Sequence, residues 1–239
     1  MSGAGMGWFA NLYNPIDAGL FYGVFTVVVL HRVMTASGLR HTLPLLVVLL
    51  PLLLYMGLTY SRGALISLLA AALVTSLMVG KRQFLALLAM LLVVGLALVI
   101  YGDALVEAEV DKGFNGRIPL WADAFGLIQQ KPWLGHGLGQ AFDYVIPPKM
   151  ITYPFPHNYL MTLWVHYGLV GVGLFMGIIV YCAVTCWRYR HRPEATLTAG
   201  LLTFGFMGIQ SYVDELVRLP HQYWLLIWLP VAMAFRLRR

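Results

Sequence analysis

The chain alternates between long apolar segments and short polar connections. Most of the apolar segments approach the roughly 20 residues that a helix needs to cross a bilayer. One polar stretch of more than fifty residues, 102–157, separates the fourth segment from the fifth. The pattern therefore predicts an all-α, polytopic transmembrane helix bundle with one large loop. Its seven expected spans cover residues 16–31, 43–60, 63–80, 83–101, 158–187, 196–213 and 222–236.

Basic residues indicate the orientation of these spans. With the loop 102–157 outside, six basic residues lie outside and ten lie inside, most of the ten in short connections. Because Lys and Arg are retained in cytoplasmic loops, we expect the loop 102–157 on the outer face, which is the periplasmic face if the membrane is a Gram-negative inner membrane. Residues 1–101 then hold four spans, and residues 158–239 hold three spans and a basic cytoplasmic tail. The ten inside residues are Arg32, Arg40, Lys81, Arg82, Arg188, Arg190, Arg192, Arg236, Arg238 and Arg239.

The loop contains one segment with a helical pattern, "NGRIPLWADAFGLIQQKP". Asn115 is a suitable helix cap, and the segment stops before Pro132. We expect a short amphipathic helix that lies either on the membrane surface or over the bundle. Its predicted apolar stripe consists of Ile118, Trp121, Phe125 and Ile128.

The composition agrees with the membrane class: 60% of residues are hydrophobic and 11% are charged. A net charge of +6 would suggest nucleic acid in a soluble protein, but here it matches cytoplasmic retention of Lys and Arg. The expected partner is the lipid bilayer and not nucleic acid. Cys182 and Cys186 are too few for a closed zinc site. The glycine-rich "WLGHGLGQAF" follows no predicted strand, which argues against dinucleotide binding. We expect neither a metal nor a cofactor.

Several ionisable residues fall at the same outer ends of the predicted spans. Arginine binds phosphate oxygens through two N–H groups at once and stays charged at any physiological pH. A histidine that is neutral near pH 7 can take a proton from an incoming hydroxyl. This set suits a phosphate-bearing substrate at the bilayer surface, with arginine in the place of a divalent ion. The candidate residues are Arg62, Arg117, His157, Arg218 and His221.

Each candidate also has a simpler possible role. Arg62 could extend from the bilayer to the interface, and Arg117 could face solvent, although a basic residue at a helix start opposes the helix dipole. His157 could bond a loop carbonyl at the helix entrance, and the charged residues of 214–221 could pair with one another. His166, about 13 Å along the predicted helix, is expected to pack and form a hydrogen bond inside the bundle.

Three stretches carry a family resemblance. They are "SRGA", then "GRIPLWADAFGLIQQKPWLGHGLGQAF", then "PHNYLMTLWVHYGLVGVGLF". This order of S-R-G, R-x-x-x-W, P-x-x-G-x-G-x-G and H-N resembles the O-antigen ligase and polymerase superfamily of membrane glycosyltransferases. The closing "DELVRLPHQYWLLIWLP" is also similar to the last outer turn and span of that family. The resemblance extends over residues 11–236.

The resemblance implies a function for the outer cluster. Members move a glycan from an undecaprenyl-pyrophosphate carrier to an acceptor, such as lipid A-core, another glycan or a protein. By the motif positions, Arg62 and Arg117 hold the pyrophosphate. His157 positions or deprotonates the acceptor hydroxyl, and Asn158 orients the loop or the histidine. The implied enzyme is an O-antigen ligase-type glycosyltransferase that needs no metal ion.

Several other functions remain open at this point. Within the enzyme class, the alternatives are an O-antigen or exopolysaccharide polymerase and a protein O-oligosaccharyltransferase. Outside it, the alternatives are a small-solute transporter and a non-catalytic export subunit. Members usually have ten or more spans, and residues 11–23 resemble a stretch from their middle. We therefore expect the chain to lack several amino-terminal helices of the family, as a fragment, a misassigned start or half of a split protein.

Overall fold

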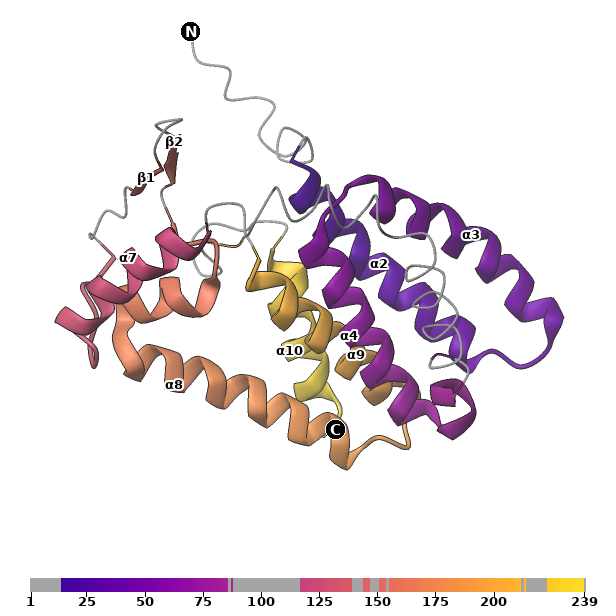
Figure 1. Cartoon of the computed structure of the whole chain (residues 1–239). Coiled ribbons are helices and arrows are strands. Elements are labelled where there is room, and N and C mark those ends of the chain that lie inside the picture. The colour runs from indigo at the N-terminus through magenta and orange to yellow at the C-terminus, as the bar shows by residue number, and fades with distance from the viewer. Residues whose placement is uncertain are drawn as a thin grey trace, which may run out of the picture.

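The structure is a computed structural model that describes residues 14–85, 87, 117–138, 144–146, 151–153, 155–211, 213 and 223–238. Helices dominate these residues (Figure 1). The helices are α2 (Pro15–Thr35), α3 (Leu39–Leu58), α4 (Arg62–Val79), α7 (Arg117–Gln130), α8 (Tyr159–Arg188), α9 (Pro193–Ile209) and α10 (Trp224–Arg236). Two short strands, β1 (Tyr144–Ile146) and β2 (Ile151–Tyr153), pair in antiparallel register.

The helices confirm the all-helical, multi-pass class. Six of the seven predicted segments correspond to α2, α3, α4, α8, α9 and α10. The remaining segment, 83–101, lies almost wholly outside the described residues. Within the described residues, four helices are long and apolar enough to cross a membrane, namely α2, α3, α4 and α8, and α10 is a shorter apolar helix. The β1–β2 hairpin was not predicted, because three-residue strands are too short to produce a period-two pattern.

Polar caps mark where three of the helices begin. The Asn14 side chain accepts the backbone N–H of Ile16 at the start of α2, where proline takes the first helical position. The Ser61 side chain accepts from Ala64 at the start of α4. The Asn158 side chain accepts from Met161 at the start of α8. Such caps satisfy N–H groups that have no partner within the helix.

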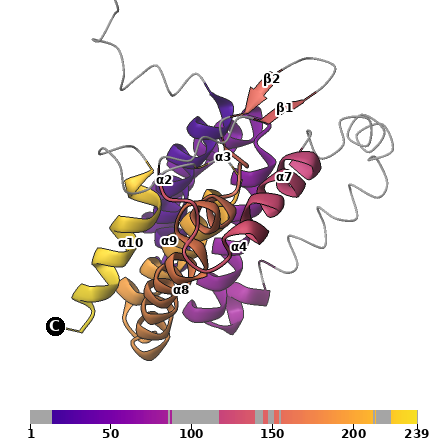
Figure 2. The same cartoon turned by 90° about the vertical axis from the view of Figure 1, so that its left-hand side faces the viewer.

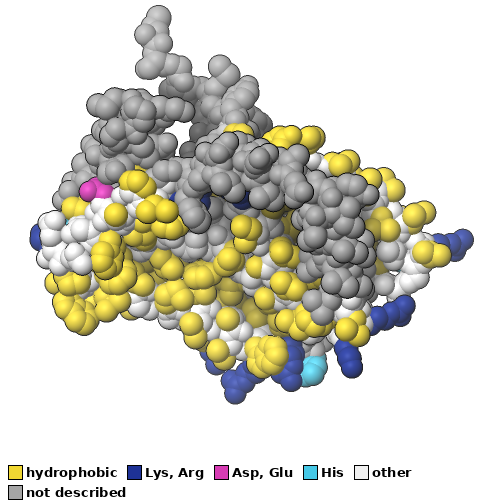
Figure 3. Space-filling model, in the orientation of Figure 1, with side chains coloured by type: hydrophobic (Ala, Val, Ile, Leu, Met, Phe, Trp, Pro, Cys, Tyr) yellow, Lys and Arg dark blue, Asp and Glu magenta, His cyan; other side chains and the backbone are white. Residues whose placement is uncertain are grey.

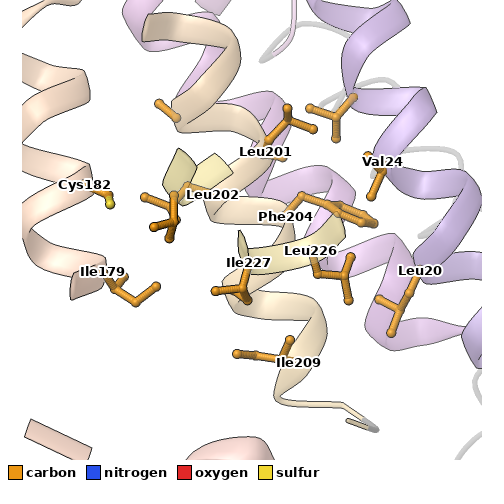
Figure 4. Close-up of a cluster of buried hydrophobic side chains, with 14 of the residues drawn as sticks. Leu20, Val24, Ile179, Cys182, Leu201, Leu202, Phe204, Ile209, Leu226 and Ile227 are labelled. Carbon is orange, nitrogen blue, oxygen red and sulfur yellow. The ribbon is translucent and has the colours of Figure 1, made fainter. Parts of the chain in front are cut away.

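The core lies between α9 and the helices around it. Helix α9 packs against α2, α4, α8 and α10, and its Phe204 is fully buried. Glycines allow the close approach: a Cβ on Gly23 would lie 2.1 Å from the Phe204 ring, and a Cβ on Gly205 would lie 1.7 Å from the Leu226 carbonyl oxygen. Small residues are typical of such interfaces in membranes. Cys182 joins this cluster (Figure 4).

Helix α7 covers the first part of α8, so the covering alternative is confirmed for this face. Leu120, Ala124 and Ile128 are buried against Val165, with Trp121 partly buried beside them. The predicted stripe was therefore half wrong, since Ile118 and Phe125 are 58% and 50% exposed. Two apolar rows run along this helix, and periodicity could not tell which row packs. Asn115, the expected cap, lies outside the described residues. The β1–β2 hairpin lies above α7 in both views (Figures 1 and 2).

Helix α8 is sharply bent, which the predicted single span did not anticipate. At Gly168 the backbone leaves the helical region, with φ 66° and ψ −169°. Residues 159–167 form a short first part beneath α7, and residues 169–188 form a long second part (Figure 1). The second part alone has the roughly 20-residue length of a membrane span. His166 accordingly does not lie deep in the bundle.

The residues after α7 supply the partners that this bend removes. A straight helix would bond the N–H groups of 169 and 170 to the carbonyls of Val165 and His166. Instead these two carbonyls accept from the backbone N–H groups of His136 at 2.8 Å and Gly137 at 2.9 Å. We call residues 132–138 the glycine clasp.

The clasp also accepts the N–H groups on the other side of the bend. Leu169 N–H donates to the Pro132 carbonyl at 2.8 Å, and Val170 N–H donates to the Trp133 carbonyl at 3.2 Å. Two helical bonds are thus exchanged for four bonds to the clasp. Side chains add three more contacts, from Trp164 Nε1 to Pro132 O (2.9 Å), from His136 Nε2 to Leu127 O (2.8 Å) and from His166 Nδ1 to Gly137 O (3.0 Å).

Replacing Gly168 with alanine is expected to destabilise the fold. Its new Cβ would lie 2.2 Å from the Trp133 carbonyl carbon, and a positive φ is costly for any residue with a Cβ. Gly173→Ala is the matched control in the same helix, because a Cβ at that position would have nothing within 4 Å. Detergent-solubilised protein would be heated and then run on size exclusion. Gly168→Ala should lose its monodisperse peak at a temperature several degrees below that of the unmodified protein, whereas Gly173→Ala should not. Equal midpoints would contradict the role given to the bend.

Candidate functional site

The starts of α4 and α8 meet the end of α9 at one end of the bundle. A Cβ on Gly63 would lie 2.5 Å from the Ser211 side chain, which places the S-R-G turn directly against the end of α9. Arg117, the first residue of α7, donates from Nη2 to the Ser211 carbonyl at 2.9 Å. Ser211 therefore contacts both Gly63 of the S-R-G turn and Arg117, although neither motif contains it.

Both arginines raise the positive potential of this end. Arg62 is exposed and is the first residue of α4, where the helix dipole is positive. Arg117 is half-buried, and its pKa is lowered by burial and then by the charge of Arg62. Two guanidinium groups that repel each other in this way form a site suited to an anion.

His157 lies in a tight turn just before α8. Its φ is 53°, a conformation that residues with a Cβ seldom adopt outside constrained sites. The turn is fixed on both sides: Trp121 Nε1 donates to the Pro156 carbonyl at 3.0 Å, and Asn158 caps the helix. The Phe155 ring lies 4.5 Å from the imidazole, between ring centroids. The tryptophan of the R-x-x-x-W motif therefore bonds to the residue immediately before the H-N motif.

The environment of His157 keeps the imidazole neutral. Burial lowers its pKa to about 4, and the positive charge of Arg117 contributes to the shift. The ring is therefore unprotonated at pH 7 and can accept a proton. An anion bound between the arginines would offset the repulsion from Arg117 and so favour the protonated ring.

Two side chains next to the histidine position the mouth of α8. Asn158 Oδ1 accepts the Met161 N–H at 3.1 Å, so its carbonyl oxygen serves as the helix cap. Gln210, at the end of α9, accepts the Leu160 N–H at 3.4 Å. Asn158 therefore orients the first turn of α8, directly after the histidine. Gln210 was not predicted, because its role depends on a contact between residues 50 positions apart.

The structure brings Arg62, Arg117 and His157 together, and we call these three residues the basic cluster. The other two candidates, Arg218 and His221, lie outside the described residues. Among the residues that the structure describes, no three His, Cys, Asp or Glu side chains are placed to hold a metal ion. The supporting residues that sequence reasoning missed are Ser211 and Gln210, which lie in an ordinary helix end without a motif.

The comparisons with known proteins agree with these motifs. The family model described as O-antigen ligase matches residues 46–176, which is more than half of the chain. The chain belongs to the O-antigen ligase family. It is also 30% identical over 229 residues to a protein of Pseudomonas aeruginosa named "O-antigen ligase". That alignment covers 96% of this chain and 56% of the relative, so the chain spans about half the relative's length.

The matched region includes all three residues of the basic cluster, since Arg62, Arg117 and His157 all lie within 46–176. The region also contains the glycine clasp and the bend of α8 that the clasp holds. Family membership and the membrane-spanning helices together identify a multi-pass membrane protein.

The pKa of His157 gives a direct test of the cluster geometry. We expect the imidazole of His157 to titrate near pH 4. NMR of 13C-labelled histidine would follow the titration, and loss of the signal in His157→Gln would assign it. Arg117→Gln should move the midpoint upward, toward the ordinary value of about 6.5, because a repelling charge is removed. Arg40→Gln, at the start of α3, is the matched control and should leave the midpoint unchanged.

The same shift has a consequence for stability. Because the folded pKa of His157 lies below its unfolded value, the unfolded chain takes up the proton first as pH falls. The contribution of His157 to the free energy of unfolding is therefore constant above about pH 6.5. This contribution falls as the pH is lowered from there to about 4, so the fold is destabilised in that range. A His157 midpoint near 6.5 in the unmodified protein would contradict the buried, arginine-facing position.

Proposed function

We propose that this chain transfers a glycan from an undecaprenyl-pyrophosphate carrier to an acceptor hydroxyl at the periplasmic face of the bacterial inner membrane, as an O-antigen ligase. The single observation that carries the proposal is the basic cluster. Two arginines and a histidine held neutral meet at one end of a membrane helix bundle. Membership in the O-antigen ligase family supports the same chemistry.

The arginines bind and stabilise the leaving group. In glycan transfer from such a carrier, the bond between the anomeric carbon and a phosphate oxygen breaks, and negative charge collects on the pyrophosphate. Arg62 and Arg117 present N–H groups that match phosphate oxygens. The amino-terminal end of α4 adds positive potential at Arg62. The proposal therefore assigns to arginine the charge stabilisation that a divalent ion supplies in other transferases.

His157 acts as the general base. The acceptor oxygen forms a bond to the anomeric carbon as its proton passes to the imidazole, and the pyrophosphate departs from the opposite side with inversion. A ring with a pKa of about 4 is a weak base in the absence of the donor. Pyrophosphate bound to Arg117 would raise that pKa toward the working range. Deprotonation of the acceptor is thereby coupled to donor binding.

The glycan donor, the acceptor and the membrane face on which the site lies are all parts of this proposal. The basic end of α4 and α8 is assigned to the periplasm from the distribution of Lys and Arg. In Figure 3 several Lys and Arg side chains line the lower and right-hand edges of the molecule, away from α7. A polymerase would use the same cluster with a growing glycan as acceptor. A ligase and a polymerase are therefore distinguished by whether the chain rescues a host that lacks its ligase or a host that lacks its polymerase.

A surface-glycan gel tests the proposal in cells. The chain is expressed in one host that lacks its O-antigen ligase and in another that lacks its polymerase, with insertion checked by blot. Restored lipopolysaccharide banding in the first host alone is the expected result. His157→Ala and Arg117→Ala should each reduce banding roughly tenfold or more, because one proton-transfer or charge-stabilising group contributes about 100-fold or more to the rate.

A matched variant separates site chemistry from general damage. Lys131→Ala removes an exposed positive charge just after α7 without touching the basic cluster, and should retain banding. Unmodified chain that inserts well but rescues neither host would contradict the proposed ligase activity. Rescue of the polymerase-deficient host alone would replace the ligase assignment with a polymerase. Full banding from Arg117→Ala would overturn the role given to that residue.

A further inference from the structure

The glycine clasp exposes large apolar side chains that the proposed chemistry does not use. Trp133, Leu134 and Leu138 are 66%, 75% and 68% exposed. The clasp holds the bend of α8 through backbone hydrogen bonds, and these bonds do not involve the three side chains. Exposed apolar groups that lie together in this way mark a surface that is covered in use.

The hydrogen bonds of the clasp define its level relative to the membrane. The second part of α8 runs over residues 169–188 and ends at the exposed Arg188. At about 1.5 Å per residue, its length is about 30 Å, which equals the hydrocarbon thickness of a bilayer. Leu169 and Val170 therefore lie at the boundary of the hydrocarbon. Their backbone N–H groups bond directly to Pro132 and Trp133, so the clasp lies at the same level.

The apolar surface of the clasp continues into the surface that α8 presents to lipid. Leu169, Val170 and Leu174 are 40%, 50% and 69% exposed along the second part of α8. Hydrophobic side chains cover both the end of the molecule that carries α7 and the neighbouring side that carries α8 (Figure 3). Tryptophan is enriched at the membrane interface, where the hydrocarbon meets the lipid headgroups.

We propose that the tip of the glycine clasp, formed by Trp133, Leu134 and Leu138, inserts into the bilayer leaflet beside the basic cluster and anchors α7 to the membrane. The occupant of this surface is lipid, because the surface is continuous with the lipid-facing side of α8. The anchor holds Arg117 at the level of the headgroups, where a lipid-linked pyrophosphate would lie. The anchor itself does not depend on the proposed transfer reaction.

Nitroxide accessibility in liposomes tests the anchor. The chain contains only two cysteines, and both are buried, so a label can be attached selectively at Leu134→Cys or Leu138→Cys. Oxygen concentrates in hydrocarbon, and a water-soluble nickel chelate concentrates in the aqueous phase. Asp123→Cys, on the exposed side of α7, is the aqueous control, and Leu174→Cys is the lipid control.

We expect the oxygen-to-nickel ratio at both clasp positions to match Leu174→Cys and to exceed that at Asp123→Cys several-fold. Ratios at both clasp positions equal to that at Asp123→Cys would overturn the anchor and leave a water-exposed or protein-binding surface. Elution of each labelled variant at the unmodified volume controls for folding. Leu138→Cys makes the outcome independent of Leu134, which adjoins the bonded residue Trp133.

Discussion

The fold around the basic cluster depends on an exchange of backbone hydrogen bonds at Gly168. Backbone N–H and C=O groups near lipid must be satisfied within the protein, because hydrocarbon offers no partners. A bend in α8 would leave four such groups unpaired, and the glycine clasp bonds to all four of them. Glycine is required at the bend because its φ is positive and its Cα lies against the Trp133 carbonyl.

This exchange determines where the histidine lies. An unbent helix over 30 residues would be about 45 Å long and would carry its first turns far from the bilayer. The bend leaves a second part of membrane length and turns the first part beneath α7. His157, immediately before that first part, then meets α7 and the end of α9 at the same end of the bundle. The P-x-x-G-x-G motif thus acts on the site through the backbone of α8.

Electrostatics explains why the cluster suits an anion. The charges of Arg62 and Arg117 repel each other, and the charge of Arg117 disfavours a proton on His157. An anion bound beside neighbouring positive charges reduces such repulsion. The proposed binding of a pyrophosphate rests on this general effect.

The sequence by itself determined the membrane class, most of the helices and the candidate cluster. Long apolar segments are visible without a structure, because each helix satisfies its own backbone bonds and needs about 20 apolar residues to span a bilayer. The motifs singled out Arg62, Arg117 and His157, which the structure brings together. Only the tertiary structure decided which apolar row of α7 is buried, that α8 bends at Gly168, and that Ser211 and Gln210 support the cluster. These features depend on contacts between residues far apart in the chain, and local periodicity carries no information about such contacts.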